Sequence, residues 1–201
     1  MKRKMNLLFL SFFCVLLAMA APGELKEKLQ TLSGVSAIET LKTELYPEKY
    51  LVRVTQEVDP LGKQAGTFKQ RVVLCHIGFD RPTVLVTEGY GGAYALRETY
   101  QEELSKLLNA NVIFVEYRYF LKPDPLNWDY LTAENSAYDL HRITELFKQI
   151  YTGKWISTGI SKGGQTTTLY RAYFPDDVDF SVPYVAPLNR GVEDGRHEIF
   201  L

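Results

Sequence analysis

The first third of the chain combines helical and extended patterns of hydrophobic positions. Residues 24–45 carry apolar residues at helical spacing and predict two short polar helices that pack on or cap a core. Residues 50–58, YLVRVTQEV, alternate like a half-buried strand, and residues 67–79 form a second strand-like run. The turn-forming segment DPLGKQAG joins these two runs, so they predict a β-hairpin. The apolar positions of the two predicted helices are Leu25, Leu29, Leu32, Ile38, Leu41 and Leu45.

After the hairpin, buried strands alternate with helices. The predicted elements are a strand in RPTVLVTE, an amphipathic helix over 94–108, a strand in NVIFVEYRY, a long helix over 133–151, a strand in KWIST, a helix that ends at Phe174 and a strand in VDFSVPYV. Short, continuously apolar strands are typical of a parallel sheet that is covered on both faces. Antiparallel strands followed by βαβ units therefore predict an α/β fold, with a mostly parallel sheet and helices on both faces.

The first 21 residues, MKRKMNLLFLSFFCVLLAMAA, follow a different pattern from the rest. Lys2, Arg3 and Lys4 precede an apolar run that closes on small residues, which predicts a secretory signal peptide over residues 1–20. The alternative is an uncleaved membrane anchor, but the apolar run has about 15 residues and a span needs roughly 20. We therefore expect export to the periplasm or beyond, no stable membrane insertion after cleavage, and one domain over residues 21–201.

Composition narrows the possible functions. With 46% hydrophobic and 23% charged residues, the chain has globular proportions. It carries 23 basic and 24 acidic residues, and the predicted leader holds three of the basic ones, so a nucleic-acid partner is disfavoured. Cys75 is the one cysteine after the leader, so no internal disulfide is expected, and its apolar surroundings predict a buried thiol. No cysteines or histidines are paired at metal-ligand spacing, and no cofactor is expected.

The segment WISTGISKGGQTTTLYRAY contains the strongest chemical signal. Gly159, Ser161 and Gly163 match the G-x-S-x-G nucleophile elbow, in which a serine occupies a strained turn between a strand and a helix. The match falls between a predicted strand and a predicted helix, which is the setting that this motif requires. Ser161 is therefore the predicted catalytic nucleophile.

A glycine-rich segment, EGYGG, follows the strand in RPTVLVTE. In elbow hydrolases the oxyanion hole uses the amide after the serine and a second amide from the loop after the third strand. This predicts backbone donors at Lys162 and Tyr90. The alternative is a phosphate-cradling loop, but the sequence has no G-x-G-x-x-G or lysine-bearing P-loop motif.

Several motifs, in order over roughly residues 67–190, resemble the PS-10 type of bacterial secreted serine peptidases, which includes tripeptidyl aminopeptidases. They are FKQRVVLCHIGFDRPTVLVTEGYGG, VEYRYF, AYDLHRITELFKQIYTGKWISTGISKGGQT and VDFSVPYVAPLN. More distantly, they are similar to the prolyl carboxypeptidase and dipeptidyl peptidase group. The resemblance implies an α/β-hydrolase fold with a helical cap and a Ser-Asp-His triad that releases short peptides from amino termini. It aligns Ser161 with the nucleophile and residues 88–92 with the oxyanion loop.

Two carboxylates are candidates for binding the free ammonium of a peptide. Glu88 and Glu116 are the best placed, because each comes at or just after the end of a predicted strand. An alternative for Glu116 is a structural ion pair with Arg118.

The base of the triad is the missing part. His76 and His141 precede Ser161, whereas the triad of this fold runs serine, acid, histidine along the chain. His197, with Asp194 before it, follows Ser161, but both would have to act from one short segment. We therefore expect the acid and base beyond Leu201, so that the chain would be the N-terminal portion of one catalytic domain, lacking its last strands and cap. Alone it would then be nearly inactive.

The elbow motif and the leader predict a secreted serine hydrolase that forms an acyl-enzyme on Ser161. The resemblance implies that it is an exopeptidase that releases short peptides, expected to be tripeptides. An esterase or lipase of the same fold is one alternative. A non-catalytic, degenerate peptidase that acts as a binding module is another. The sequence does not indicate an oligomeric state.

Overall fold

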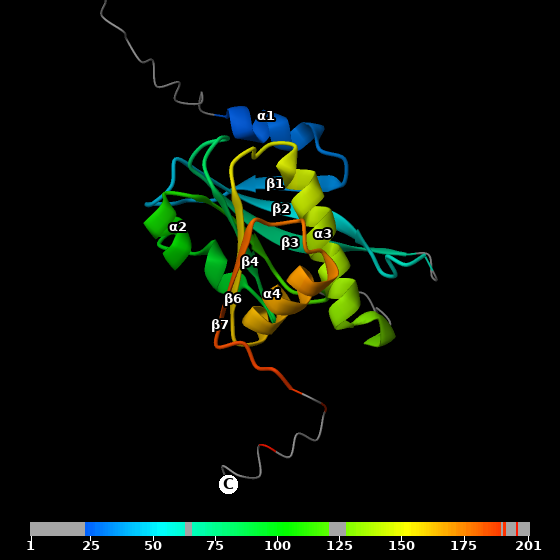
Figure 1. Cartoon of the computed structure of the whole chain (residues 1–201). Coiled ribbons are helices and arrows are strands. Elements are labelled where there is room, and N and C mark those ends of the chain that lie inside the picture. Colours follow the sequence, from blue (N-terminus) through cyan, green and yellow to red (C-terminus); the bar gives the residue numbers. More distant parts are fainter. Residues whose placement is uncertain (1–22, 63–65, 121–127, 190, 192–195, 197–201) are drawn as a thin grey trace, which may run out of the picture.

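The computed structural model describes residues 23–62, 66–120, 128–189, 191 and 196, which form a single mixed sheet with helices on both faces (Figure 1). The elements are α1 (Glu24–Thr31), β1 (Val35–Thr40), β2 (Glu48–Glu57), β3 (Thr67–His76), β4 (Thr83–Thr87), the 3-10 helix η1 (Ala93–Leu96), α2 (Glu103–Leu108), β5 (Asn111–Val115), the 3-10 helix η2 (Trp128–Tyr130), α3 (Ala133–Lys148), β6 (Trp155–Ile160), α4 (Lys162–Tyr173) and β7 (Phe180–Tyr184).

The strand order is β1-β2-β3-β5-β4-β6-β7. β1, β2, β3 and β5 pair antiparallel in succession, whereas β5, β4, β6 and β7 run parallel. The predicted hairpin is confirmed by the continuous β2–β3 register, from Glu48 opposite His76 to Glu57 opposite Thr67. The predicted α/β class, with antiparallel strands first and parallel strands after them, is therefore confirmed.

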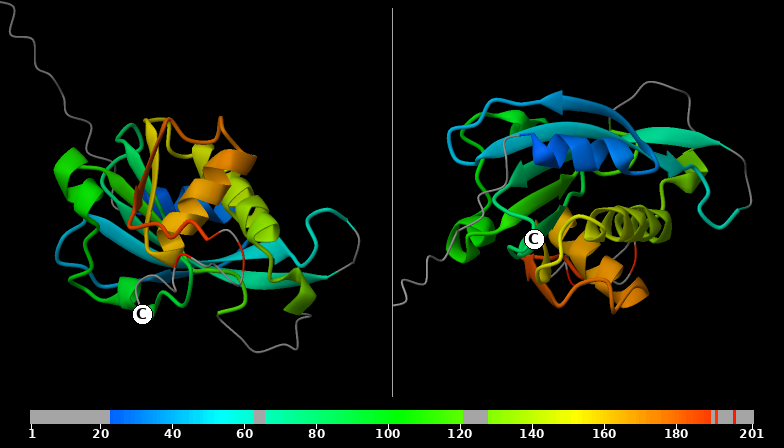
Figure 2. Two further views of the ribbon diagram at one scale, coloured as in Figure 1. Left: turned by 60° about the horizontal axis from the view of Figure 1, so that its bottom comes forward. Right: turned by 90° about the horizontal axis from the view of Figure 1, so that it is seen from above.

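Alternation along β4 explains how both faces of the sheet are covered. Val84 and Val86 belong to a cluster with Ala95 and Ala110, from the segments around η1 and α2. Leu85 points the other way and packs in the larger cluster, which includes residues of α1 and α3. Figures 1 and 2 show α2 on one side of the sheet and α3 with α4 on the other. Every residue of β4 is buried, as its continuous apolar sequence predicts.

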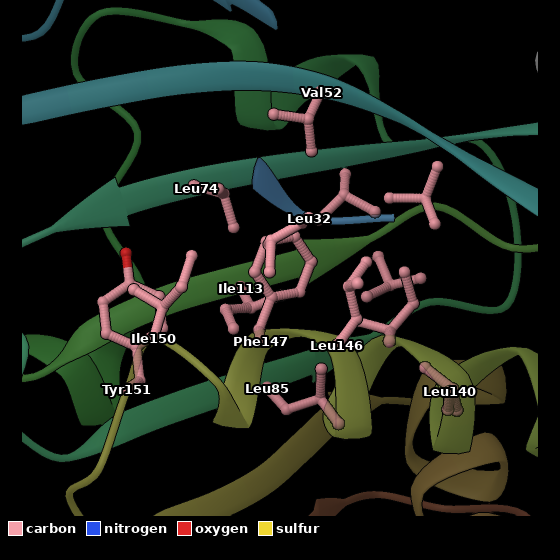
Figure 3. Close-up of a cluster of buried hydrophobic side chains, with 14 of the residues drawn as sticks. Leu32, Val52, Leu74, Leu85, Ile113, Leu140, Leu146, Phe147, Ile150 and Tyr151 are labelled. Atoms are coloured by element: carbon pink, nitrogen blue, oxygen red, sulfur yellow. The ribbon is translucent and has the colours of Figure 1, made fainter. Parts of the chain in front are cut away.

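Helix α3 forms the main cover of the larger cluster. Thr132 precedes its first residue, and the Thr132 side chain accepts a hydrogen bond from the Asn135 amide at 3.1 Å and so caps the helix. Its buried residues Leu140, Ile143 and Phe147 recur at helical spacing. Figure 3 shows Leu146 and Phe147 pointing from α3 toward the strands that carry Leu74 and Ile113. This packing fixes α3, and the segment that follows it, against the strands that lead to the candidate site.

The prediction of a second helix within residues 24–45 is wrong. α1 forms and buries Leu25 and Leu29, but residues 35–40 form the edge strand β1. Gly34 stands between them with φ +96°, a conformation that ends the helical path. Ile38 then pairs with Val52 of β2, and its partly buried side chain packs against the larger cluster from this strand.

The prediction of one helix over residues 94–108 is also wrong, because the structure has two shorter helices there, η1 and α2. Glu102 caps α2 by accepting a hydrogen bond from the Ser105 amide at 2.7 Å, which starts a new helix at that point. The ring of Tyr100 lies 5.9 Å from that of Phe114, in an edge-to-face contact. Packing of the linking segment against β5 therefore overrides the helical pattern.

The predicted leader, residues 1–20, lies outside the described residues. Within the part of the chain that the structure describes, no helix is long and apolar enough to cross a membrane.

Candidate active site

Ser161 occupies a sharp turn between β6 and α4. β6 ends at Ile160 and α4 begins at Lys162, so this single residue connects the strand to the helix. Its backbone has φ 56° and ψ −119°, an unusual conformation for a residue with a Cβ, which costs about 1–3 kcal/mol. Ser161 is exposed at the carboxyl edge of the parallel strands. This is the local geometry that the G-x-S-x-G pattern requires.

Two glycines make this elbow, defined here as residues 159–163, sterically possible. A Cβ on Gly159 would lie 2.5 Å from the carbonyl carbon of Gly163, and one on Gly163 would lie 2.6 Å from the oxygen of Thr87. Contacts this short do not occur for real side chains, so neither position accepts one. The Thr87 hydroxyl also lies 2.8 Å from the Gly163 oxygen, which ties β4 to the start of α4.

The first turn of α4 presents free amide groups beside Ser161. The Ser161 amide donates to the Tyr184 oxygen of β7 at 3.0 Å, and the Ser161 oxygen accepts from the Gln165 amide at 2.9 Å. The amides of residues 162–164 come before this first helical bond and have no acceptor within the helix. The positive end of the helix dipole therefore lies next to the serine.

The segment Glu88–Gly92, called the glycine turn below, lies against the elbow. A Cβ on Gly89 would lie 2.5 Å from the Cβ of Lys162, so the two backbones approach closely. The Lys162 Nζ donates to the Gly89 oxygen at 2.9 Å. The Tyr117 amide donates to the Tyr90 oxygen at 3.2 Å. The structure thus brings the predicted donor residues Lys162 and Tyr90 into one region with Ser161.

Glu116 does not lie where an ammonium group could reach it. Its side chain is 2% exposed, and its Oε2 lies 2.8 Å from both Arg71 Nη1 and the Gly92 amide. The substrate-binding role predicted for Glu116 does not fit this burial. Its contacts hold the glycine turn in place.

The alternative ion pair between Glu116 and Arg118 is also not formed. Arg118 is completely buried and binds Asp139 instead, with Nε 2.8 Å from Oδ2 and Nη2 3.0 Å from Oδ1. The two residues therefore bind different partners, Arg71 and Asp139.

Glu88 lies beside a cavity of about 490 Å³. Its carboxylate accepts a hydrogen bond from the Tyr94 hydroxyl, and it lines the cavity together with Gly159 and Ile160 of β6. Glu102 and Glu103 also line this cavity, which gives it an acidic wall. Its size and mixed lining are compatible with a small part of a ligand. Of the two predicted carboxylates, Glu88 is the one that the structure leaves beside open space.

The described histidines are occupied elsewhere. His76 is 2% exposed and lies 3.2 Å from the Tyr151 hydroxyl, and burial lowers the pKa of its ring. His141 Nδ1 lies 2.8 Å from Asp177 Oδ2, and its ring stacks on Phe174. Asp194 and His197 lie outside the described residues. Within the described ranges, no hydrogen bond joins Ser161 to a histidine.

Two features were not predicted from the sequence. One is the buried Arg71–Glu116 pair that supports the glycine turn, which joins positions 45 residues apart and leaves no local pattern. The other is the role of the Lys162 side chain, because the elbow motif implicates only the backbone amide of this residue. A lysine as the first residue of a helix opposes the helix dipole, and this local conflict is a signal that sequence reasoning could have used. No group of three or more potential metal ligands occurs among the described residues.

Comparisons with known proteins give the following results. The family described as PS-10 peptidase S37 matches residues 19–200. A prolyl tri/tetrapeptidyl aminopeptidase of Streptomyces mobaraensis is 34% identical over 185 residues, covering 90% of this chain and 38% of that protein. A probable serine protease of Arabidopsis thaliana is 26% identical over 113 residues, covering 48% of this chain and 23% of that protein. The chain thus spans well under half the length of these curated relatives.

Among solved structures, an acetyl xylan esterase from Paenibacillus sp. R4 has a TM-score of 0.53 at 14% identity, covering 87% of this chain and 60% of that one. Acetyl xylan esterase 1 from Thermoanaerobacterium sp. JW/SL YS485 has a TM-score of 0.50 at 13% identity, covering 82% and 57%. At these identities the likeness shows the fold alone, which is that of the α/β-hydrolases.

Proposed function

Because this chain belongs to the PS-10 peptidase S37 family, we propose that it acts as a serine exopeptidase with Ser161 as its nucleophile. The observation that carries the proposal is the strained, exposed position of Ser161 between β6 and α4, next to the glycine turn. A backbone conformation of this kind persists where the surrounding structure enforces it, and it is concentrated at functional sites.

The proposed reaction begins with attack of the Ser161 Oγ on a peptide carbonyl carbon, as its proton passes to a general base. The carbonyl oxygen becomes an oxyanion, which accepts hydrogen bonds from the amides of Lys162 and Tyr90. The C–N bond then breaks, and the leaving amine takes the proton and departs. Water hydrolyses the remaining acyl-enzyme, with the same base accepting a proton from water and returning it to Ser161.

The base is not found among the described residues, where both histidines have other partners. We propose that the acid and the histidine belong to a part of the catalytic domain that corresponds to the remaining length of the Streptomyces relative. Without a base a serine is a weak nucleophile, so the proposed reaction depends on that histidine.

The proposed substrates are peptides with a free amino terminus, from which tripeptides are released. The Streptomyces relative carries the name of a prolyl tri/tetrapeptidyl aminopeptidase, which supports this class. Glu88, beside the acidic cavity, is the proposed partner of the substrate ammonium. The leader-like residues 1–20 support the proposal that the enzyme is exported.

Labelling with a fluorophosphonate probe tests the nucleophile. The full-length protein should form a phosphonyl adduct on Ser161, identified by mass spectrometry of the peptides, and Ser161→Ala should form none. Thr168→Ala, at an exposed position of the same helix, removes a hydroxyl that donates only to the Gly164 oxygen within the helix, and it should label like the wild type. Absence of an adduct at Ser161 would favour the non-catalytic binding module.

Substrate comparison tests the reaction class and the role of Glu88. Tripeptide anilides with a free amino terminus should be cleaved faster than short acyl esters, whereas the reverse order would favour an esterase. Glu88→Gln should raise KM for free tripeptide anilides by about tenfold, the order expected for one ion pair of about 1–2 kcal/mol. It should leave KM for amino-blocked anilides nearly unchanged, and equal changes for both substrates would exclude an ammonium contact.

A further inference from the structure

The side chain of Lys162 links the two halves of the proposed oxyanion hole. Its Nζ donates to the Gly89 oxygen at 2.9 Å and lies 3.5 Å from the centre of the Tyr117 ring. The second contact is a cation–π interaction, which stabilises the ammonium on its open side. Lys162 thus reaches from the elbow to the glycine turn and to the segment after β5.

The geometry of a peptide group gives the Gly89 contact its significance. The oxygen of Gly89 and the amide of Tyr90 belong to the same peptide unit, which is planar and trans, so they point in opposite directions. A donor that holds the oxygen therefore fixes the direction of the amide. Lys162 is that donor.

Two further contacts leave the same amide available. The Tyr90 oxygen accepts from the Tyr117 amide, and the Gly92 amide donates to Glu116. Together with the Lys162 contact, they fix three polar groups of the glycine turn without using the Tyr90 amide. The turn is thus held in a way that leaves this donor for a ligand.

The position of Lys162 in the helix supports the same interpretation. As the first residue of α4 it places a positive charge at the positive end of the helix dipole, which is unfavourable. Burial lowers the pKa of its ammonium group, while the nearby Glu88 acts in the opposite direction. A lysine at this position is unfavourable for the helix. Its contact with Gly89 compensates for this unfavourable interaction.

We propose that Lys162 is a positioning residue, whose ammonium group orients and polarises the Gly89–Tyr90 peptide so that the Tyr90 amide becomes a stronger oxyanion donor. A charged donor on a carbonyl oxygen draws electron density from the whole peptide group, which strengthens its N–H as a donor. One residue thereby provides the first donor through its backbone and aims the second through its side chain. The proposal rests on the proposed function of Ser161.

The test measures the second-order rate of Ser161 phosphonylation by a fluorophosphonate, because the phosphonyl oxygen takes the place of the oxyanion. In the mature full-length protein, which lacks the predicted leader and with it Cys14, Lys162→Met should react about 10–100-fold more slowly, somewhat less than the 100–1,000-fold cost of removing a whole donor. Lys26→Met, which removes an exposed lysine of α1, is the matched control and should react at the wild-type rate.

Chemical rescue separates an orienting charge from a structural role. Lys162→Cys alkylated with 2-bromoethylamine regains an ammonium group at nearly the lysine length, and its rate should return to within about threefold of the wild type. Alkylation with 1-bromopropane gives a neutral side chain of similar size and should not restore the rate. Cys75 should not interfere, because it is completely buried and burial raises its pKa to about 12.

The outcomes distinguish the proposed function of Ser161 from the proposed role of Lys162. If wild-type Ser161 forms no adduct, the proposed function fails. If Ser161 reacts but Lys162→Met reacts at the wild-type rate, or the neutral alkyl group restores the rate, the orienting role of Lys162 is wrong and the function stands. A rate that rises as Lys162 loses its proton at alkaline pH would assign it as a base and overturn the proposal, which expects the rate to fall.

Discussion

At the scale of single residues, the site depends on a serine in a backbone conformation that favours glycine. Ser161 has φ 56°, and its amide and carbonyl are fixed by Tyr184 and Gln165. The strain is thus maintained by neighbours on β7 and α4. Exposure of the hydroxyl follows directly, because the turn directs the side chain away from both elements.

Removing the side chain at this position should therefore stabilise the fold. Ser161→Gly should raise the free energy of unfolding by about 1 kcal/mol, since glycine occupies positive φ without a steric cost. Ser161→Ala keeps the Cβ and is the matched control, with stability near that of the wild type. Urea unfolding followed by circular dichroism measures both variants. Equal stability of the two would show that the turn is not strained.

At the scale of elements, what could be predicted from the sequence depended on whether a segment's neighbours are close in the chain. The strands from β2 to β7, the helices α3 and α4 and the setting of the elbow were predicted, because each has a continuous hydrophobic pattern and local end signals. The strand β1 was not predicted, because its apolar residues acquire their extended form by pairing with β2. The break within the helix predicted over 94–108 was not predicted, because it arises from the cap at Glu102 and the contacts of Tyr100.

The candidate site shows the same division. Ser161 and its two glycines could be found because the motif is contiguous, and the glycine turn because it follows the expected strand. The burial of Glu116 could not be predicted, because its partner Arg71 is on the antiparallel half of the sheet. The Lys162 contact with Gly89 also joins distant segments. Motifs thus located the reacting group, whereas its supporting contacts became visible only in three dimensions.

At the scale of the whole molecule, Arg118 joins the antiparallel and parallel halves of the fold. Its guanidinium donates to the oxygens of Glu57 and Val58 at the end of β2, and to Asp139 in α3. The guanidinium also binds the oxygen of Tyr130 in η2. Because Arg118 is completely buried, these contacts are shielded from water. The sheet, η2 and α3 therefore depend on one buried charge.

Removing that charge should destabilise the fold, and the loss of stability should depend on pH. Arg118→Met leaves Asp139 buried without its partner and should lower the free energy of unfolding by about 3–5 kcal/mol at pH 7. Burial already raises the pKa of Asp139 to about 6, and Arg118 opposes this shift. A carboxyl whose folded pKa exceeds its unfolded value adds stability at low pH and loses it as pH rises through the folded pKa. The loss of Arg118 should raise that folded pKa further.

The difference in stability between Arg118→Met and the wild type should therefore shrink as the pH falls from 7 to 5. Urea unfolding at each pH measures it. In the double variant with Asp139→Asn, this pH dependence should disappear, because no carboxyl remains to take up a proton. A difference that stays constant with pH would show that Asp139 does not carry the effect.

The order of the strands has a consequence for synthesis on the ribosome. β4, which lies beside the place of β6, and its partner β5 are both complete in the sequence before residue 116, and the β2–β3 hairpin precedes them. A nascent chain can therefore assemble this template before the codons for the elbow are translated. The unfavourable bend at Ser161 would then emerge onto a surface that is already shaped to receive it, and the later arrival of β7 would lock it through the Tyr184 oxygen.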